Sequence, residues 1–463
     1  MNGPGFTRRQ RLTVLLLVVL IVVVLAMTVG FIVTSIQSWE RATPATLQPS
    51  PSQLRTPVSS PSPAPTPLPT PEEGIWSQVQ AARLFDQIAH QVETLRGLSP
   101  RAEVPLSFLD EREMATLLRQ RYVERSLEAQ IQPYIALGLL PDASISIDPR
   151  EAAGVYIPDQ EQLYVAIGQQ EVGADDQALL GHAYAHALQD QHFDLGAMDA
   201  RATSIDAALA VQALVEGDAA LLTALYRHED LTVADWRHLE GLILEAEQPG
   251  YGEALDRSEV WARLQRFPYR EGRRFAEALF QAGGWEAVNR AYADPPRSTE
   301  QVLHPERYLG APGERDEPTQ VVVPELGAIL GEDWRMLLQG TLGEFVVGLY
   351  LDLLLPEEVS WEAADGWDGD TFTVWDHEDG RRVLVWRTIW DSTAEAVEFE
   401  HALFALIPQR YLPAWPVDPP RGLTGRWWTT DAGAVSVSRV ARYVIFARAP
   451  DVNALANVMG MLP

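Results

Sequence analysis

Apolar residues recur every three or four positions along most of the chain after residue 73, which is the spacing of amphipathic helices. The first such run extends from Gly74 to Leu95 and stops before Gly97, a residue type that often ends helices. A second helix is predicted from a cap at Asp110 to about Leu137. The same pattern predicts further helices over residues 175–193, 204–228 and parts of 236–293.

Two short runs with the alternation of β-strands interrupt this helical pattern. They are GVYIPD (154–159) and QLYVAIG (162–168), joined by a polar turn around Gln160 and Glu161. Such a pair predicts a β-hairpin. The hairpin directly precedes the helix that begins at residue 175, so we expect a sheet edge beside that helix.

The pattern changes after about residue 315. One helix is predicted over 336–355, followed by a hairpin made of TFTVWD (371–376), the turn HEDG and RRVLVWRTIW (381–390). A helix at 394–406, strands within 426–430 and 434–448, and a last helix from Asp451 complete the region. Mixed strands and helices of this kind predict a separate α+β module.

The predicted fold class is therefore α+β and mainly helical. A chain of 463 residues exceeds what one hydrophobic core usually organises. We expect a first folded domain over residues 74–314 and a C-terminal α+β module over residues 315–463.

A membrane span is predicted near the N-terminus. Residues 12–36 carry no charge and are long enough to cross a bilayer of ~30 Å. Arginines within residues 1–11 favour a cytoplasmic N-terminus, and the Pro-, Ser- and Thr-rich residues 37–73 are expected to form an extended stalk. The alternative is a cleaved signal peptide, whose apolar stretch is usually shorter. We expect an uncleaved anchor in the cell membrane and extracytoplasmic C-terminal domains.

Composition limits the chemistry that the chain can perform. The formal net charge is -28, so nucleic acid is not an expected partner. The chain contains no Lys and no Cys, which excludes Schiff-base lysines, thiol catalysis and thiolate metal sites. A metal ion would have to be bound by His and carboxylate side chains.

Two histidines and one glutamate have the spacing of such a site. His182 and His186 are four residues apart on a predicted helix, so both imidazoles lie on one face and can reach one metal ion. Glu216, within VEGDA on the next long helix, can supply a third ligand. Three protein ligands and one open position are typical of catalytic zinc, so zinc is the expected metal.

This constellation resembles the gluzincin branch of zinc metallopeptidases, whose H-E-x-x-H motif is followed by a Glu on a later helix. It is more closely similar to a group of membrane-anchored prokaryotic surface proteins with H-E-x-x-H-A-L-Q-D-Q, a preceding Tyr-containing hairpin and a later E-G-D-A. The matching segments here are GVYIPDQEQLYV, HAYAHALQDQHFDL, ALVEGDAALL and PPRSTEQVLHPERYL, spread over roughly residues 105–310. The resemblance implies a zincin-like domain with an edge hairpin before the active-site helix.

The chain departs from that family at the catalytic position. Ala183 stands where the family has the glutamate that takes a proton from zinc-bound water. No neighbour is an obvious substitute, because Asp190 lies a turn beyond His186 and Glu216 is expected on the metal. The resemblance also gives His304 the role of stabilising the tetrahedral intermediate in active members; the alternative is a structural residue before Pro305.

Several other polar and aromatic residues have simpler explanations. His192 is expected to end its helix rather than to bind metal, and Gly217 to let another backbone approach. Asp365, Asp368 and Asp370 could bind calcium but are expected to form a solvated turn. Five tryptophans could line a groove but are expected to pack a core: Trp375, Trp386, Trp390, Trp427 and Trp428.

The sequence thus predicts a membrane-anchored metallopeptidase homologue that is catalytically inactive and binds a peptide or protein, with zinc retained. Two alternatives stay open. One is an active zinc peptidase with a non-standard base, and the other is a metal-free interaction protein of the cell surface.

Overall fold

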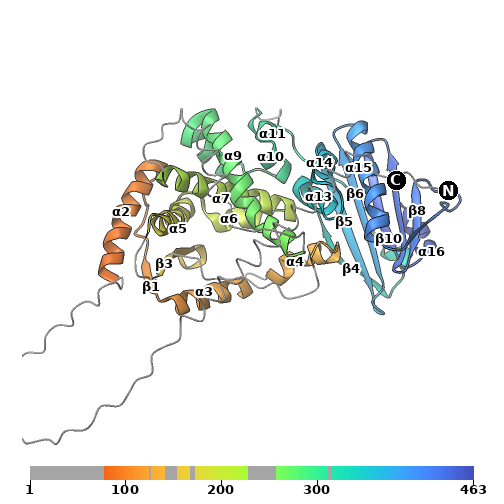
Figure 1. The fold of residues 1–463 in the computed structure, drawn as a ribbon, viewed down its shortest axis with the longest axis horizontal. Coiled ribbons are helices and arrows are strands. Elements are labelled where there is room, and N and C mark those ends of the chain that lie inside the picture. Colours follow the sequence, from red (N-terminus) through yellow and green to blue (C-terminus); the bar gives the residue numbers. More distant parts are fainter. Residues whose placement is uncertain are drawn as a thin grey trace, which may run out of the picture. The chain divides into compact units, whose positions relative to one another are not determined.

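The computed structural model describes residues 78–124, 127–140, 154–166, 173–227, 257–310 and 315–462 (Figure 1). The chain divides into two units, Met1–Thr70 and Pro71–Pro463, and all described residues belong to the second. The predicted membrane span 12–36 and the predicted stalk 37–73 lie outside the described residues, which begin at Gln78.

Helices dominate the described residues before 311, as the apolar spacing predicts. Their bounds are α2 (Gln78–Arg96), α3 (Glu111–Glu124), α4 (Leu127–Ala136), α5 (Ala174–Phe193), α6 (Leu195–Arg201), α7 (Ile205–Arg227), α9 (Arg257–Ala293), α10 (Thr299–Leu303) and α11 (Pro305–Leu309). Helix α7 packs against both α5 and α9. At the α7–α9 contact, a Cβ on Gly217 would overlap the backbone of Gly272, which confirms the close approach expected at Gly217.

Three details of this helical region differ from the prediction. The helix expected from Asp110 to Leu137 consists of α3 and α4, and residues 125–126 between them lie outside the described part. Helix α9 changes direction at Gly283 and Gly284, whose backbone angles are not helical. Helices α10 and α11 are each five residues long, too short to produce a recognisable period in the sequence.

A three-stranded sheet lies against α5. It has the order β1-β3-β2, with β1 (Leu106–Leu109), β2 (Gly154–Ile157) and β3 (Gln162–Ala166). The strands β2 and β3 form the predicted antiparallel hairpin around the short 3-10 helix η1 (Pro158–Gln160), and β1 pairs with β3 in parallel. Leu163 and Val165 pack into one core cluster with Leu180 and Ala183 of α5.

The C-terminal region contains a seven-stranded antiparallel sheet of order β4-β5-β6-β10-β9-β8-β7 (Figure 1). Its strands are β4 (Trp334–Gly340), β5 (Trp367–His377), β6 (Arg382–Trp390), β7 (Ala414–Val417), β8 (Arg426–Thr430), β9 (Gly433–Val440) and β10 (Tyr443–Ala449). The helices of the region are α12 (Gly327–Leu330), α13 (Gly343–Asp352), α14 (Glu357–Glu362), α15 (Thr393–Arg410) and α16 (Val452–Met459). The protein is therefore α+β, as predicted.

Helices cover both faces of this sheet, because alternate strand residues belong to two different core clusters. Trp386 and Phe446 pack with Phe399 of α15 and with residues of α13. Their neighbours Val385 and Ile445 pack with residues of α16. The five tryptophans predicted to pack a core are all buried, which confirms that they form core rather than an open groove.

The single helix predicted over 336–355 is wrong. Residues 334–340 form the edge strand β4, paired with β5, and the helix α13 begins only at Gly343. Gly343 has a φ of +80°, a conformation that favours glycine and separates the two elements. Continuous apolar runs do not distinguish a strand from a helix by periodicity alone.

The solvated turn predicted for Asp365, Asp368 and Asp370 is correct only for Asp365. Asp368 and Asp370 are buried within β5. Asp370 accepts hydrogen bonds from the backbone of Leu342 and Gly343 and from two tryptophan indoles. Those donors fix the start of α13, so Asp370 is structural and is not a calcium ligand.

Among the described residues, α7 is the one helix long and apolar enough to cross a membrane. Most of its apolar window is buried inside the protein, and it packs against α5 and α9. The same length and composition are common in core helices.

Candidate functional site

Three predicted ligand atoms converge between α5 and α7. His182 Nε2 lies 3.2 Å from Glu216 Oε2, and His186 Nε2 lies 3.3 Å from the same oxygen. The two imidazole nitrogens are 3.1 Å apart. The three side chains predicted as metal ligands therefore place their donor atoms at the corners of a nearly equilateral triangle.

The hydrogen-bond partner of His186 Nδ1 determines which of the two ring nitrogens carries the proton. His186 Nδ1 lies 2.8 Å from Gln189 Oε1. The orientation of that amide is fixed, because Gln189 Nε2 donates to Val215 O and to Asp218 Oδ2. The amide oxygen can only accept, so Nδ1 carries the hydrogen and neutral His186 has a lone pair on Nε2.

The same reasoning applies to His182. Its Nδ1 lies 3.3 Å from the hydroxyl oxygen of Thr223, and that hydroxyl donates its single hydrogen to Ala219 O at 2.7 Å. Nδ1 of His182 must therefore donate to Thr223, which leaves the lone pair on Nε2. When both imidazoles are neutral, their two Nε2 lone pairs and the Glu216 carboxylate face a common point.

An arrangement of three acceptors requires a positive charge at its centre. The donors around a tetrahedral ion with bonds of roughly 2.0–2.1 Å are roughly 3.3–3.4 Å apart, close to the separations of 3.1–3.3 Å here. Second nitrogens held by oxygen acceptors are also typical of metal-binding histidines. The donor set therefore fits zinc.

The charges of the cluster favour the same conclusion. Burial alone would raise the pKa of Glu216, but His186 and His182 outweigh it and hold that pKa well below its ordinary value. Burial alone would lower the pKa of His186, but Glu216 outweighs it and raises that pKa. The cluster thus holds a bound positive charge strongly, whether a proton or a metal ion.

A buried polar network lies behind His186 and was not predicted from the sequence. Asp218 accepts from Gln189, from Tyr292 Oη at 2.7 Å and from Arg96 Nε at 2.8 Å. These residues come from α5, α7, α9 and α2. The network fixes the Gln189 amide and, through it, the proton on His186. The signal in the sequence was polar Gln189 and Asp218 on otherwise apolar helix faces.

Ala183, the residue after His182 on α5, places its methyl group in the protein interior. Ala183 is 3% exposed and faces β2. A Cβ added to Gly154 of β2 would lie 3.7 Å from the Cβ of Ala183. In the part of the chain that the structure describes, no fourth His, Asp or Glu joins the cluster. Asp190 is engaged elsewhere, since it accepts from Tyr156 Oη and from the backbone of Leu195.

Two further residues complete the surroundings of the cluster. The ring of Tyr269, from α9, stacks on His182 with centroids 6.0 Å apart, a contact that the sequence did not indicate. His192 lies in the last turn of α5, where its Nε2 meets Ser99 O. His192 is therefore a helix-end residue, as expected.

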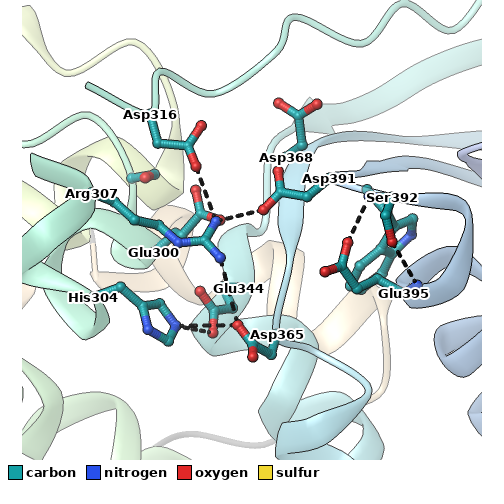
Figure 2. A network of polar contacts seen from close by, with 12 residues as sticks. Glu300, His304, Arg307, Asp316, Glu344, Asp365, Asp368, Asp391, Ser392 and Glu395 are labelled. Atoms are coloured by element: carbon teal, nitrogen blue, oxygen red, sulfur yellow. Dashed lines mark hydrogen bonds and ion pairs between the residues drawn. The ribbon is translucent and has the colours of Figure 1, made fainter. Parts of the chain in front are cut away.

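His304 belongs to a different group of side chains. It lies between α10 and α11, and its Nε2 faces Glu344 of α13 at 2.9 Å and Asp365 at 3.7 Å (Figure 2). Beside this group, Arg307 forms ion pairs with Glu300, Asp316 and Asp391. The sequence reasoning found His304 but neither its partners nor this second cluster.

Comparison with known proteins finds a similarity in the C-terminal region. The sequence model described as "Domain of unknown function (DUF8575)" matches residues 335–459, which contain the seven-stranded sheet from β4 onward. No curated protein matches the chain, and no solved structure matches it. Residues 335–459 are thus similar to a domain family to which no activity is assigned.

Proposed function

We propose that this chain is a membrane-anchored, extracytoplasmic relative of gluzincin metallopeptidases that retains a zinc site but has lost peptide hydrolysis. The observation that carries the proposal is the convergence of three acceptor atoms from His182, His186 and Glu216 beside Ala183. Ligands are present, and the general base is absent.

His182, His186 and Glu216 would hold the ion, which supplies a Lewis acid for a carbonyl or carboxylate oxygen when bound. Gln189 and Thr223 orient the two imidazoles. None of the cluster residues can remove a proton from water and pass it to a leaving amine, because both imidazole Nε2 atoms and the carboxylate face the ion. Loss of a positioned base typically lowers a rate by ~10²–10⁴.

The strand β2 is a suitable place for an extended ligand. It is an edge strand of its sheet, and Gly154 at its start lies against Ala183, next to His182. An extended peptide can pair with such an edge through backbone hydrogen bonds. The ligand class that this arrangement favours is an unstructured peptide segment whose carbonyl or carboxylate reaches the ion.

The proposal is tested by measuring zinc content, peptide binding and peptide hydrolysis on the full chain purified in detergent. We expect zinc bound at the cluster, zinc-dependent peptide binding and no hydrolysis. Glu216→Gln should weaken zinc at this cluster at least tenfold. The matched control is Glu277→Gln, because Glu277 pairs with Arg273 on α9 and its side chain is as exposed as that of Glu216.

Two results would overturn the proposal in different directions. A parent protein without zinc at this cluster would indicate a metal-free interaction protein. A parent protein that cleaves peptides in a zinc-dependent way would indicate an active peptidase with an unrecognised base.

A further inference from the structure

Glu344, in the first turn of α13, is a buried carboxylate with one oxygen unused. The residue is 3% exposed, and its Oε1 lies 2.9 Å from His304 Nε2. Its Oε2 has no hydrogen-bond partner among the described residues. Burial raises the pKa of Glu344, and a buried polar oxygen without a partner is costly, so the contact with His304 alone does not satisfy this group.

Glu344 points into a cluster that includes a second carboxylate. Figure 2 shows His304, Glu344 and Asp365 directed toward one another. His304 Nε2 is 3.7 Å from Asp365 Oδ1, and one donor atom from each residue lies within 4.8 Å of the others. The separations of 2.9 and 3.7 Å bracket the roughly 3.3 Å expected between neighbouring ligands of a metal ion.

Arg307, a cation beside this cluster, already forms ion pairs with other acidic side chains. Arg307 pairs through its Nη1 with Glu300, Asp316 and Asp391, and its Nη2 lies 3.7 Å from Asp365. One guanidinium therefore serves three carboxylates before it reaches Asp365. No hydrogen bond from Arg307 to Glu344 is present among the described residues, so this guanidinium does not satisfy the unused oxygen of Glu344.

We propose that His304, Glu344 and Asp365 form a second metal site, separate from the His182 cluster, that takes a divalent transition-metal ion. One imidazole and two carboxylates suit zinc or manganese better than calcium, which prefers oxygen ligands alone. The ion would take the Glu344 carboxylate as a ligand and replace the direct contact between His304 and Glu344.

Such a site would affect stability by connecting two parts of the fold. Its ligands come from the α10–α11 junction, from α13 and from the turn before β5, so the ion would join the helical region to the region matched by the domain family. A ligand that binds the folded state alone raises stability. The site is therefore expected to hold these two regions together rather than to perform chemistry.

The test uses the full chain in detergent with His182→Gln and His186→Gln, so that the first cluster no longer binds metal. Zn²⁺ and Mn²⁺ binding are measured by calorimetry and by elemental analysis after dialysis. We expect one equivalent of metal and a higher melting temperature with metal present. Asp365→Asn should weaken binding at least tenfold; the side chain of Asp365 is 61% exposed, so this change leaves the fold intact.

The matched control is Asp333→Asn, because Asp333 is also exposed and lies 4.0 Å from a histidine, His377, of the same region. This change should leave metal binding unaffected, whereas His304→Gln should abolish it. Absence of metal binding in the protein with the first cluster removed overturns the proposal. Equal affinity in the Asp365→Asn and Asp333→Asn proteins overturns it as well.

Discussion

Gln189→Met should weaken zinc binding without touching a ligand. Gln189 is 1% exposed, and its amide oxygen accepts from His186 Nδ1 at 2.8 Å. Methionine has a similar shape but offers His186 no comparable acceptor. The imidazole would then lose the contact that fixes its proton on Nδ1 and its lone pair on Nε2.

The size of the effect follows from two independent considerations. A buried N–H left without a partner costs about 1–3 kcal/mol. Changing the residue that orients a metal-binding histidine typically lowers metal affinity about 10–100-fold, which corresponds to about 1.4–2.7 kcal/mol. We therefore expect zinc affinity at the first cluster to fall by about 10–100-fold.

The assay is a competition titration between the protein and a chromophoric chelator, in the His304→Gln background, so that binding reports the first cluster. The control is Gln191→Met, two residues further along α5. Gln191 accepts from the backbone of Arg101 and Ala102 and does not touch either histidine, so its zinc affinity should equal that of the parent. A Gln189→Met protein that binds zinc as tightly as the parent would refute the argument from fixed proton positions.

Two further predictions concern the frame of the site. Gly217→Ala should lower the free energy of unfolding by on the order of 3 kcal/mol, because the added Cβ would overlap the backbone of Gly272. Chemical denaturation measures this loss. The control is Gly196→Ala, which should not destabilise the protein because a Cβ has room there. Asp206 accepts a hydrogen bond from the Thr299 hydroxyl. Burial raises the pKa of Asp206 from 3.8 to about 7. The folded state therefore keeps a proton that the unfolded chain has released, so stability should fall as pH rises between these values, by at most on the order of 4 kcal/mol. Asp206→Asn should flatten this dependence, and an unchanged slope would contradict the assignment.

The first cluster could be predicted because its spacing is local. His182 and His186 are one helical turn apart, and Glu216 lies in a second helix that packs on the first. The helical period and the motif were therefore sufficient to predict that these three side chains lie close together. Gln189 was visible in the same segment, but its role depends on Asp218 and Val215 of another helix.

The second cluster could not be predicted, because its members meet only through tertiary packing. His304 and Glu344 are forty residues apart, and the intervening segment includes a strand that the sequence pattern assigned to a helix. The predicted helix began too early in the sequence because residues 336–342 are mostly apolar. The start of α13 is fixed by hydrogen bonds to Asp370, and a residue so far along the chain leaves no signal near residue 343. The edge strand β4 and the buried carboxylates Glu344 and Asp370 therefore could not be predicted from periodicity.

The proposed absence of a general base is tested most directly by introducing a carboxylate at position 183 in the zinc-loaded full chain. Ala183→Glu and Ala183→Gln place side chains of equal size at one buried position, and only the first can accept a proton from water. We predict that peptide hydrolysis appears in the Ala183→Glu protein and is absent from both the parent and the Ala183→Gln protein. A parent protein that hydrolyses peptides as fast as the Ala183→Glu protein would contradict the account.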